Sequence, residues 1–130
     1  MVYEGQCNCG GIRVQVAQRP GASLVCHCRN CGRSGGGASI NYVLDEQEVV
    51  VVDDGARLKS FEDTNTKSGN RIQRKFCSIC GSSILTESPK FPGKALVKAS
   101  LFDDVAAPDL EVFSDSRQTW RSPVTGARQA

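Results

Sequence analysis

The sequence predicts a mainly β domain with little helix, in which bound metal ions stabilise a modest core. Short segments rich in β-branched residues are separated by glycine, proline and asparagine, and no stretch of a dozen residues keeps a helical apolar period. Seven cysteines stand in three tight clusters along only 130 residues, of which 39% are hydrophobic. Cysteine-bound metal ions would therefore contribute materially to stability.

The strand segments follow one another along the chain. Residues 12–16 alternate apolar and polar side chains, as a half-buried strand does, and residues 48–52 form a β-branched run that ends at a turn signal. Further strands are expected at 23–26, 38–43, 59–61, 71–76, 83–86, 95–99 and 110–113. We expect one domain over residues 1–121 and a frayed tail over 122–130, which lacks apolar periodicity.

The seven cysteines divide into four plus three. Four thiolates close a tetrahedral zinc site, whereas three leave one coordination position free for water or a ligand. Disulfides fit poorly, because an odd number leaves one thiol unpaired and because the close spacing disfavours bridges between neighbours. No signal peptide is visible at the N-terminus, so we expect a cytoplasmic protein with reduced cysteines.

Two of the clusters have the form of metal knuckles. Cys7 and Cys9 must lie in a turn to reach one metal, and two glycines follow them. Cys77 and Cys80 are also followed by a glycine, so the two knuckles together predict one four-thiolate site. Spacing alone also allows a ribbon-type site made by Cys77 and Cys80 with two cysteines of the middle cluster, Cys28 and Cys31.

The middle cluster predicts an open site. Cys26, Cys28 and Cys31 lie in one six-residue loop and would cap a metal from one side. The glycine-rich residues 32–37 that follow either let backbone approach a ligand or form a flexible loop. His27 is better explained as a residue behind the ligands or in packing than as a ligand.

The motifs resemble a known family. CNCGG at residues 7–11, CHCRNC at 26–31 and CSICG at 77–81 resemble the glutathione-dependent formaldehyde-activating enzymes, a family that includes the centromere protein V type. The resemblance continues through residues 99–104 to Trp120 and implies an Mss4-like, complex antiparallel β fold. It assigns Cys7, Cys9, Cys77 and Cys80 to a structural zinc, and Cys26, Cys28 and Cys31 to a catalytic zinc.

The resemblance also implies an activity. A thiol, glutathione in the named members, would bind at the open zinc and add reversibly to a small aldehyde such as formaldehyde, which is carbon–sulfur lyase chemistry. A zinc with three thiolate ligands suits a soft thiol better than hydroxide. Arg29 and Arg33 are either contacts for a substrate carboxylate or solvated surface charges.

Some positions depart from the family or have a simpler explanation. The family commonly has a histidine near its C-terminal strand, where this chain has Glu111. Asp103 and Asp104 are better explained as a turn after a strand, and Trp120 as core or edge packing.

Two other classes of function stay open. One is a non-catalytic zinc-binding or thiol-carrier module, since a fold does not fix a function. The other is a redox enzyme of similar fold, which needs a reactive cysteine that is not a metal ligand. The formal charge of +2 would become about −1 if seven thiolates bound two Zn²⁺, so nothing indicates a nucleic-acid partner. No run of 18 apolar residues predicts a membrane span.

Overall fold

The computed structural model describes residues 2–130 and is mainly β. The strands are β1 (Tyr3–Gln6), β2 (Arg13–Val16), β3 (Ser23–Cys26), β4 (Ser39–Asp45), β5 (Val50–Val52), β6 (Leu58–Asp63), β7 (Ile72–Cys77), β8 (Ser83–Glu87), β9 (Lys94–Lys98), β10 (Pro108–Val112) and β11 (Arg128–Gln129). One short helix, α1 (Arg29–Gly35), and three 3₁₀ turns, η1 (Glu46–Glu48), η2 (Ala99–Leu101) and η3 (Ser114–Ser116), complete the described elements.

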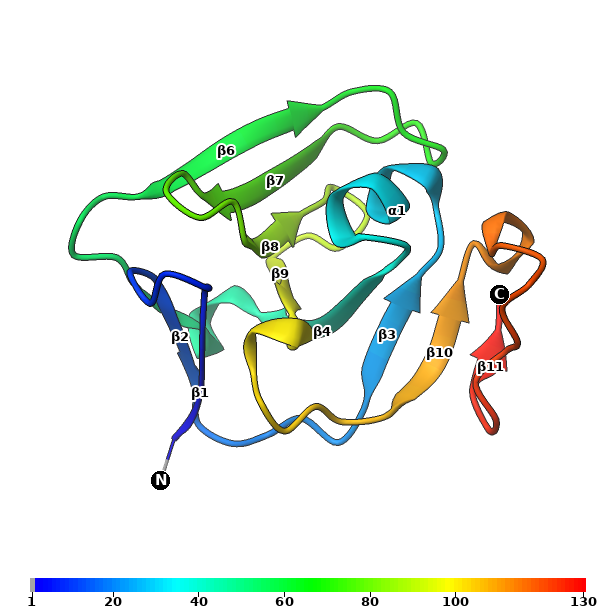
Figure 1. Cartoon of the computed structure of the whole chain (residues 1–130), viewed down its shortest axis with the longest axis horizontal. Helices are drawn as coiled ribbons and strands as arrows, with labels where there is room; N and C mark the ends of the chain where they lie inside the picture. The colour runs from blue at the N-terminus through cyan, green and yellow to red at the C-terminus, as the bar shows by residue number, and fades with distance from the viewer. Residues whose placement is uncertain (1) are drawn as a thin grey trace.

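The strands form two sheets, shown in Figure 1. The smaller sheet has the order β1-β2-β5, and the larger has the order β11-β10-β3-β4-β9-β8-β7-β6. Most neighbours are antiparallel, while β10 pairs in parallel with both β3 and β11. The predicted mainly β fold with little helix is confirmed, and each predicted strand segment overlaps an observed strand.

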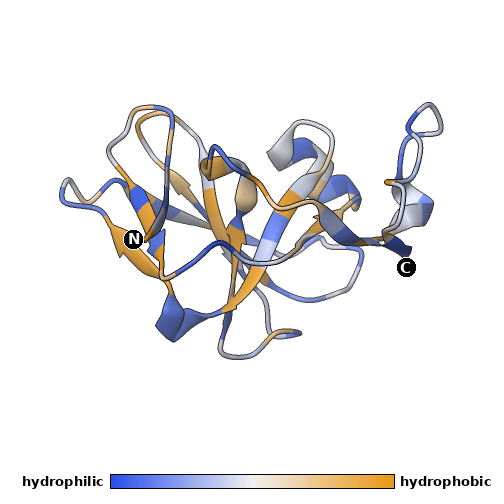
Figure 2. Ribbon diagram, turned by 90° about the horizontal axis from the view of Figure 1, so that it is seen from below, coloured by the Kyte–Doolittle hydropathy of each residue, from blue (hydrophilic) through white to orange (hydrophobic). Residues whose placement is uncertain are grey.

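Two strands were not predicted. Tyr3–Gln6 forms β1 against β2, and Arg128–Gln129 forms β11 against β10. The expectation of a frayed tail is therefore wrong for its last residues, because the Ala130 N–H donates to the Glu111 carbonyl at 2.8 Å. The strand β11 forms because residues 128–129 pair with β10, which is distant in sequence, and the composition of the tail does not indicate a strand. Figure 2 shows this mostly hydrophilic part of the chain at one side of the molecule.

The hydrophobic core lies between the two sheets. Ile12, which directly precedes β2, and Val14 of β2 pack with three residues of the large sheet, and all five side chains are fully buried: Ile12, Val14, Tyr42, Ile84 and Val97. An aromatic cluster extends this core, since the Tyr3 ring stacks on Phe102 with centroids 4.1 Å apart and the Tyr42 ring meets Phe102 edge-on. Because Tyr42 pairs with Val97 across β4 and β9, this row of side chains points to the core face.

The other face of the large sheet carries a different set of side chains. Cys26 pairs with Ser39, Asn41 pairs with Lys98, and Arg74 pairs with Thr86. Paired residues of neighbouring strands point to the same face, and so do residues two apart on one strand. Polar and cysteine side chains are thus collected on one face, which becomes the floor of the cavity described below.

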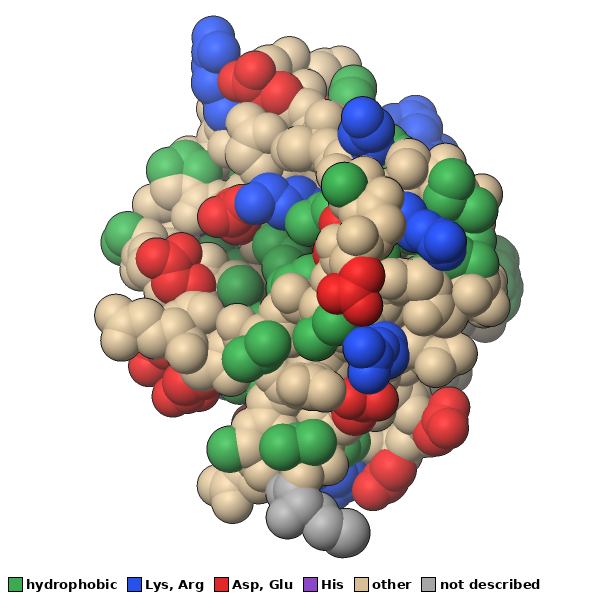
Figure 3. Space-filling view, turned by 90° about the vertical axis from the view of Figure 1, so that its left-hand side faces the viewer, with side chains coloured by type: hydrophobic (Ala, Val, Ile, Leu, Met, Phe, Trp, Pro, Cys, Tyr) green, Lys and Arg blue, Asp and Glu red, His purple; other side chains and the backbone are tan. Residues whose placement is uncertain are grey.

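Within residues 2–130, no helix is long and apolar enough to cross a membrane. On the face of the molecule in Figure 3, basic and acidic side chains are interspersed, and hydrophobic side chains gather around a hollow near the middle.

Candidate functional site

The four-cysteine cluster joins two turns that are far apart in sequence. Cys7 and Cys9 lie in the turn between β1 and β2, Cys77 is the last residue of β7, and Cys80 lies in the turn that follows it. Their four sulfurs all lie within 4.8 Å of one another. Because β1 and β2 belong to the small sheet and β7 and β8 to the large one, a metal ion bound here would join the two sheets.

The geometry of this cluster fits a tetrahedral ion. Cys9 Sγ lies 3.6 Å from Cys7 Sγ and 3.7 Å from Cys77 Sγ. A tetrahedron with zinc–sulfur bonds of about 2.3 Å has sulfur–sulfur edges of roughly 3.8 Å. Gly10 and Gly81 follow the knuckles with φ of 75° and 78°, a left-handed conformation that glycine adopts without steric cost.

The three-cysteine cluster is built at the junction of β3 and α1. Cys26 ends β3, Cys28 is the N-cap of α1, and Cys31 lies in the first turn of the helix. The Cys28 sulfur accepts the backbone N–H of Cys31 at 3.4 Å, so the cap itself holds two of the sulfurs together. The three sulfurs lie within 4.8 Å of one another.

The segment that follows is a helix rather than a loop. The glycines at residues 32–37 predicted irregular backbone, yet α1 runs from Arg29 to Gly35 and ends at Gly36 in a left-handed C-cap with φ of 75°. The capping interaction of Cys28 and the terminating glycine together outweigh the low helix propensity of the glycines inside.

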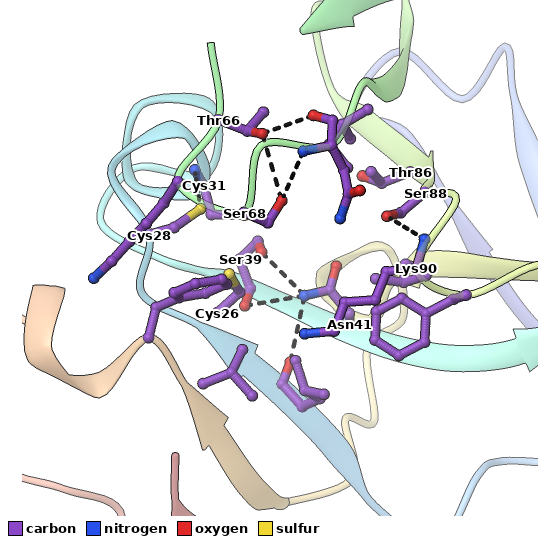
Figure 4. A pocket seen from close by; sticks show the side chains of 18 of the residues that line it. Cys26, Cys28, Cys31, Ser39, Asn41, Thr66, Ser68, Thr86, Ser88 and Lys90 are labelled. Atoms are coloured by element: carbon purple, nitrogen blue, oxygen red, sulfur yellow. Dashed lines mark hydrogen bonds between the residues drawn. The ribbon is translucent and has the colours of Figure 1, made fainter. Parts of the chain in front are cut away.

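The three cysteines open onto a cavity of about 630 Å³, shown in Figure 4. Its floor is the polar face of the large sheet, with Ser39, Asn41, Thr86 and Lys98 among the lining residues. Cys26, Cys28 and Cys31 lie at one side of the view, and Lys90 lies at the opposite side. A volume in this range is typical of pockets that bind small organic ligands.

His27 lies behind the cluster and contacts Glu111. The ring is buried, and its Nε2 lies 2.7 Å from Glu111 Oε1, while its Nδ1 meets no hydrogen-bond partner within the described chain. His27 is not among the cavity-lining residues. The placement agrees with the expectation that this histidine lies behind the ligands.

Glu111 is a buried anchor and does not line the cavity. Its Oε2 accepts the backbone N–H of Val124 at 2.8 Å and the Gln129 amide at 2.6 Å. Burial alone would raise the pKa of this carboxyl, but hydrogen bonds from Gln129, His27 and Val124 lower it to about 2. The carboxylate thus fastens the C-terminal segment and the His27 ring to β10.

Two cationic side chains face the three-cysteine cluster. The Arg74 guanidinium lies 3.7 Å from Cys31 Sγ and is held by Asp63 at 2.8 Å. Lys98 is the second, and it lies on the cavity floor. Hydrogen bonds from the thiols of Cys26 and Cys28 hold the pKa of Cys31 far below its usual range, helped by the positive charge of Lys98. The cluster therefore favours a thiolate at Cys31.

The remaining cavity wall carries lysines and hydroxyls from two loops, between β6 and β7 and between β8 and β9. Lys67 and Lys90 line it, and Thr66, Ser68 and Ser88 supply hydroxyl groups. Lys67 is already paired with Asp115 at 2.7 Å, whereas Lys90 Nζ lies 6.0 Å from the centroid of the Phe91 ring.

Several expected positions lie outside the cavity. Arg29 and Arg33 are exposed and do not line it, which favours their interpretation as solvated charges. Asp103 and Asp104 lie in a bend directly after η2. The packing expected of Trp120 is wrong, because this side chain is 80% exposed and lies against the guanidinium of Arg121.

Sequence reasoning missed the two cations that face the cysteines. Lys98 follows three apolar residues of β9, whereas Arg74 stands between the polar residues Gln73 and Lys75 of β7, and strand alternation places both side chains opposite the core. A charged residue on the core-distant face of a strand could have indicated a functional residue. However, only the strand register shows that Lys98 shares a face of the sheet with Cys26.

Comparison with known proteins identifies the family. The model of the family described as "Glutathione-dependent formaldehyde-activating enzyme" matches residues 2–116. The chain belongs to the glutathione-dependent formaldehyde-activating enzyme family. A Halomonas elongata protein named "Putative glutathione-dependent formaldehyde-activating enzyme" is 34% identical over 110 residues, which cover 79% of this chain and 67% of that protein.

The fold also has a counterpart among solved structures. The crystal structure of a Rhodobacter sphaeroides protein superposes with a TM-score of 0.62 at 21% identity, and the match covers 78% of this chain and 89% of that one. This member of the family has two cysteine clusters that could hold metal ions, and each of its seven cysteines belongs to one of them.

Proposed function

We propose that this protein is a zinc-dependent carbon–sulfur lyase that binds a thiol such as glutathione and adds it reversibly to a small aldehyde such as formaldehyde. The observation that carries the proposal is the position of Cys26, Cys28 and Cys31, whose sulfurs gather on the wall of a cavity large enough for a small organic ligand. The other cluster already offers four sulfurs, the number that closes a structural zinc.

The donor sets fit two zinc ions. Zinc prefers thiolate ligands in a tetrahedron, and the four-cysteine cluster has the sulfur spacing that this geometry requires. In the proposed assignment Cys7, Cys9, Cys77 and Cys80 hold a structural zinc, and Cys26, Cys28 and Cys31 hold a catalytic one. When bound at the three-cysteine cluster, zinc would supply the positive charge that keeps an incoming thiol deprotonated near neutral pH.

The surrounding side chains support the binding of an anionic thiol. Arg74 places a positive charge against the Cys31 sulfur, which offsets part of the negative charge of three thiolates and a fourth sulfur. Lys90 lies on the far wall of the cavity and is a suitable partner for a carboxylate of glutathione. The hydroxyls of Ser68 and Ser88 offer further polar contacts there.

The reaction itself is an addition. The thiol loses its proton, its sulfur forms a bond to the aldehyde carbon, and the π electrons of the carbonyl move to the oxygen. One proton, equal to the one that the thiol lost, then binds that oxygen and gives a hemithioacetal. Nothing is oxidised or reduced, and the reverse steps break the carbon–sulfur bond. All seven cysteines lie in the two clusters that could hold metal ions, and a thiol redox cycle needs a reactive cysteine that is not a metal ligand, so the addition reaction fits the chain better. Reduced cysteines fit a reducing compartment, and we include a cytoplasmic location in the proposal.

The test is the rate at which glutathione and ¹³C-formaldehyde interconvert with their adduct, measured by magnetisation transfer in NMR. The uncatalysed exchange is the baseline. We expect the wild-type protein to raise this rate and the Cys31→Ala variant to return it to the baseline, while Lys59→Met, an exposed change on β6, has no effect. A wild-type protein that does not exceed the baseline would contradict the proposal.

A further inference from the structure

A buried lysine on the cavity floor has unused hydrogen-bonding capacity. Lys98 is 6% exposed, and its Nζ donates to Asn41 Oδ1 at 2.7 Å. An ammonium group carries three N–H donors. Among residues 2–130, Asn41 Oδ1 is the acceptor found within hydrogen-bond distance of this group, so two donors are left for a ligand in the cavity.

The position of this ammonium group is fixed by its neighbours. Asn41 Nδ2 donates to Ser39 Oγ at 3.0 Å and to the Leu24 carbonyl at 3.4 Å, which turns Oδ1 of the same amide towards Lys98. Ser39 is the strand neighbour of Cys26, and both side chains point to the cavity face. Asn41 therefore connects the ammonium group to a residue that lies beside the three-cysteine cluster.

The charge on Lys98 is retained at neutral pH. Burial is the main cause that lowers its pKa, to about 8; the negative charge of the Cys31 sulfur opposes this change and the positive charge of Arg74 adds to it. A buried cation is costly unless a partner of opposite charge or a hydrogen-bond acceptor faces it. Arg74, which donates to Cys31 and is anchored by Asp63, already provides a cation for the cluster itself.

A second polar group on the same floor also lacks a partner. Thr86 is 5% exposed, its hydroxyl meets no hydrogen-bond partner among the described residues, and it lines the same cavity. Buried polar atoms are almost always hydrogen-bonded, so this hydroxyl is available to bond to a ligand or a water in the cavity. Thr86 pairs with Leu96, which stands two residues before Lys98 on β9. The side chains of Thr86 and Lys98 therefore both point to the cavity face.

We propose that Lys98 is a further catalytic residue, and that its ammonium group donates a hydrogen bond to the carbonyl oxygen of the aldehyde while the thiol sulfur attacks the carbon. The inference rests on the proposed function. Asn41 acts as a positioning residue, because its side-chain oxygen holds Nζ in place. The Thr86 hydroxyl supplies a second donor for the same oxygen.

The step is an electrostatic one. As the carbon–sulfur bond forms, the π electron pair moves to the carbonyl oxygen, and the negative charge that develops there is stabilised by the fixed ammonium group. The oxygen then takes a proton, and in the reverse direction it loses one as the carbon–sulfur bond breaks. The same donor thus accelerates both directions without changing the equilibrium between them.

The test separates this role from thiol binding. The variants are Lys98→Met, which keeps an unbranched side chain one atom shorter and removes the charge, and Lys98→Arg, which restores a donor. Steady-state exchange gives kcat and KM, and glutathione binding is followed separately by the thiolate charge-transfer band of the Co²⁺-loaded protein. We expect Lys98→Met to lower kcat by about 100-fold or more, with glutathione affinity changed less than about threefold.

Each outcome supports or overturns the inference. Partial recovery of kcat in Lys98→Arg supports it. A kcat within about threefold of wild type in Lys98→Met overturns it, and so does a loss of glutathione binding that accounts for the whole effect. If Lys98→Met does not fold, the Thr86→Val variant tests the same proposal. We expect this variant to lower kcat about tenfold with glutathione affinity unchanged. An unchanged kcat overturns the proposal.

Failure of the proposed function would look different. In that case wild-type Co²⁺ protein would show no glutathione-dependent band, and exchange would stay at the uncatalysed rate. The inference about Lys98 fails by itself when the wild-type protein binds glutathione and catalyses exchange, but the variants either match its kcat or lose activity only because they lose glutathione binding.

Discussion

At the scale of single residues, the buried carboxylate of Glu111 holds several groups in place behind the cavity, and one of them is the His27 ring. Glu111 holds the His27 ring, the Val124 N–H and the Gln129 amide at once. Since His27 stands between Cys26 and Cys28 in sequence, this anchor also fixes the backbone that carries two sulfurs of the cluster.

Glu111→Gln should destabilise the fold in a pH-dependent manner. The folded-state pKa of about 2 lies below the reference value of 4.5, so the carboxylate contributes stability that is complete above about pH 5 and is lost as the pH falls towards 2. At pH 7 we expect a loss on the order of 3 kcal/mol in the free energy of unfolding.

Urea unfolding of both proteins across this pH range measures the difference, and the exposed Glu46→Gln serves as the control. Any release of metal in acid affects both proteins, so the difference between them isolates Glu111. A difference that stays constant down to pH 3 would contradict this account of the carboxylate.

The residues that carry the chemistry were predictable to different degrees. The cysteines stand out in the sequence because their spacing is restrictive, and the structure brings together the two sets that the family resemblance had grouped. Lys98, Arg74 and Thr86 were not found, because their place beside the cysteines depends on strand register rather than on their sequence neighbours.

At the scale of elements, the close approach of β1 to η2 makes Gly5 a critical position. A Cβ atom on Gly5 would lie 2.6 Å from the Leu101 carbonyl oxygen, a backbone atom that cannot turn aside. We expect Gly5→Ala to lower the free energy of unfolding by about 1–3 kcal/mol through overpacking. Gly21→Ala is the matched control, since nothing lies within 4 Å of its added Cβ. Calorimetry of both variants checks this, and equal melting temperatures would count against it.

The elements that escaped prediction share a physical cause. The helix α1 is held by the Cys28 cap and ended by Gly36, although its glycines have low helix propensity. β11 exists through pairing with β10 and the hydrogen bonds of Glu111. Both depend on contacts that local composition does not report, whereas strands such as β2 and β3 have their own alternation.

At the scale of the whole molecule, the two cysteine clusters should differ in what they do for stability. The four-cysteine cluster connects the two sheets, whereas the three-cysteine cluster draws its ligands from one junction, β3 and α1. We expect Cys80→Ser to cost several kcal/mol and to broaden or abolish cooperative unfolding. Cys31→Ser should keep the fold and lose one metal ion. Thermal unfolding together with metal analysis distinguishes them, and a reversed order of stabilities would contradict the assignment.

We propose that this protein has a closed metal site with four cysteines and an open metal site with three cysteines, and that the open site binds a thiol. The most direct measurement is the zinc content per chain of protein purified without chelator, repeated after mild chelation in the presence and absence of glutathione. We expect about two zinc ions per chain. The chelator should remove one of them unless glutathione is present. A ratio of one zinc per chain that glutathione does not affect would contradict it.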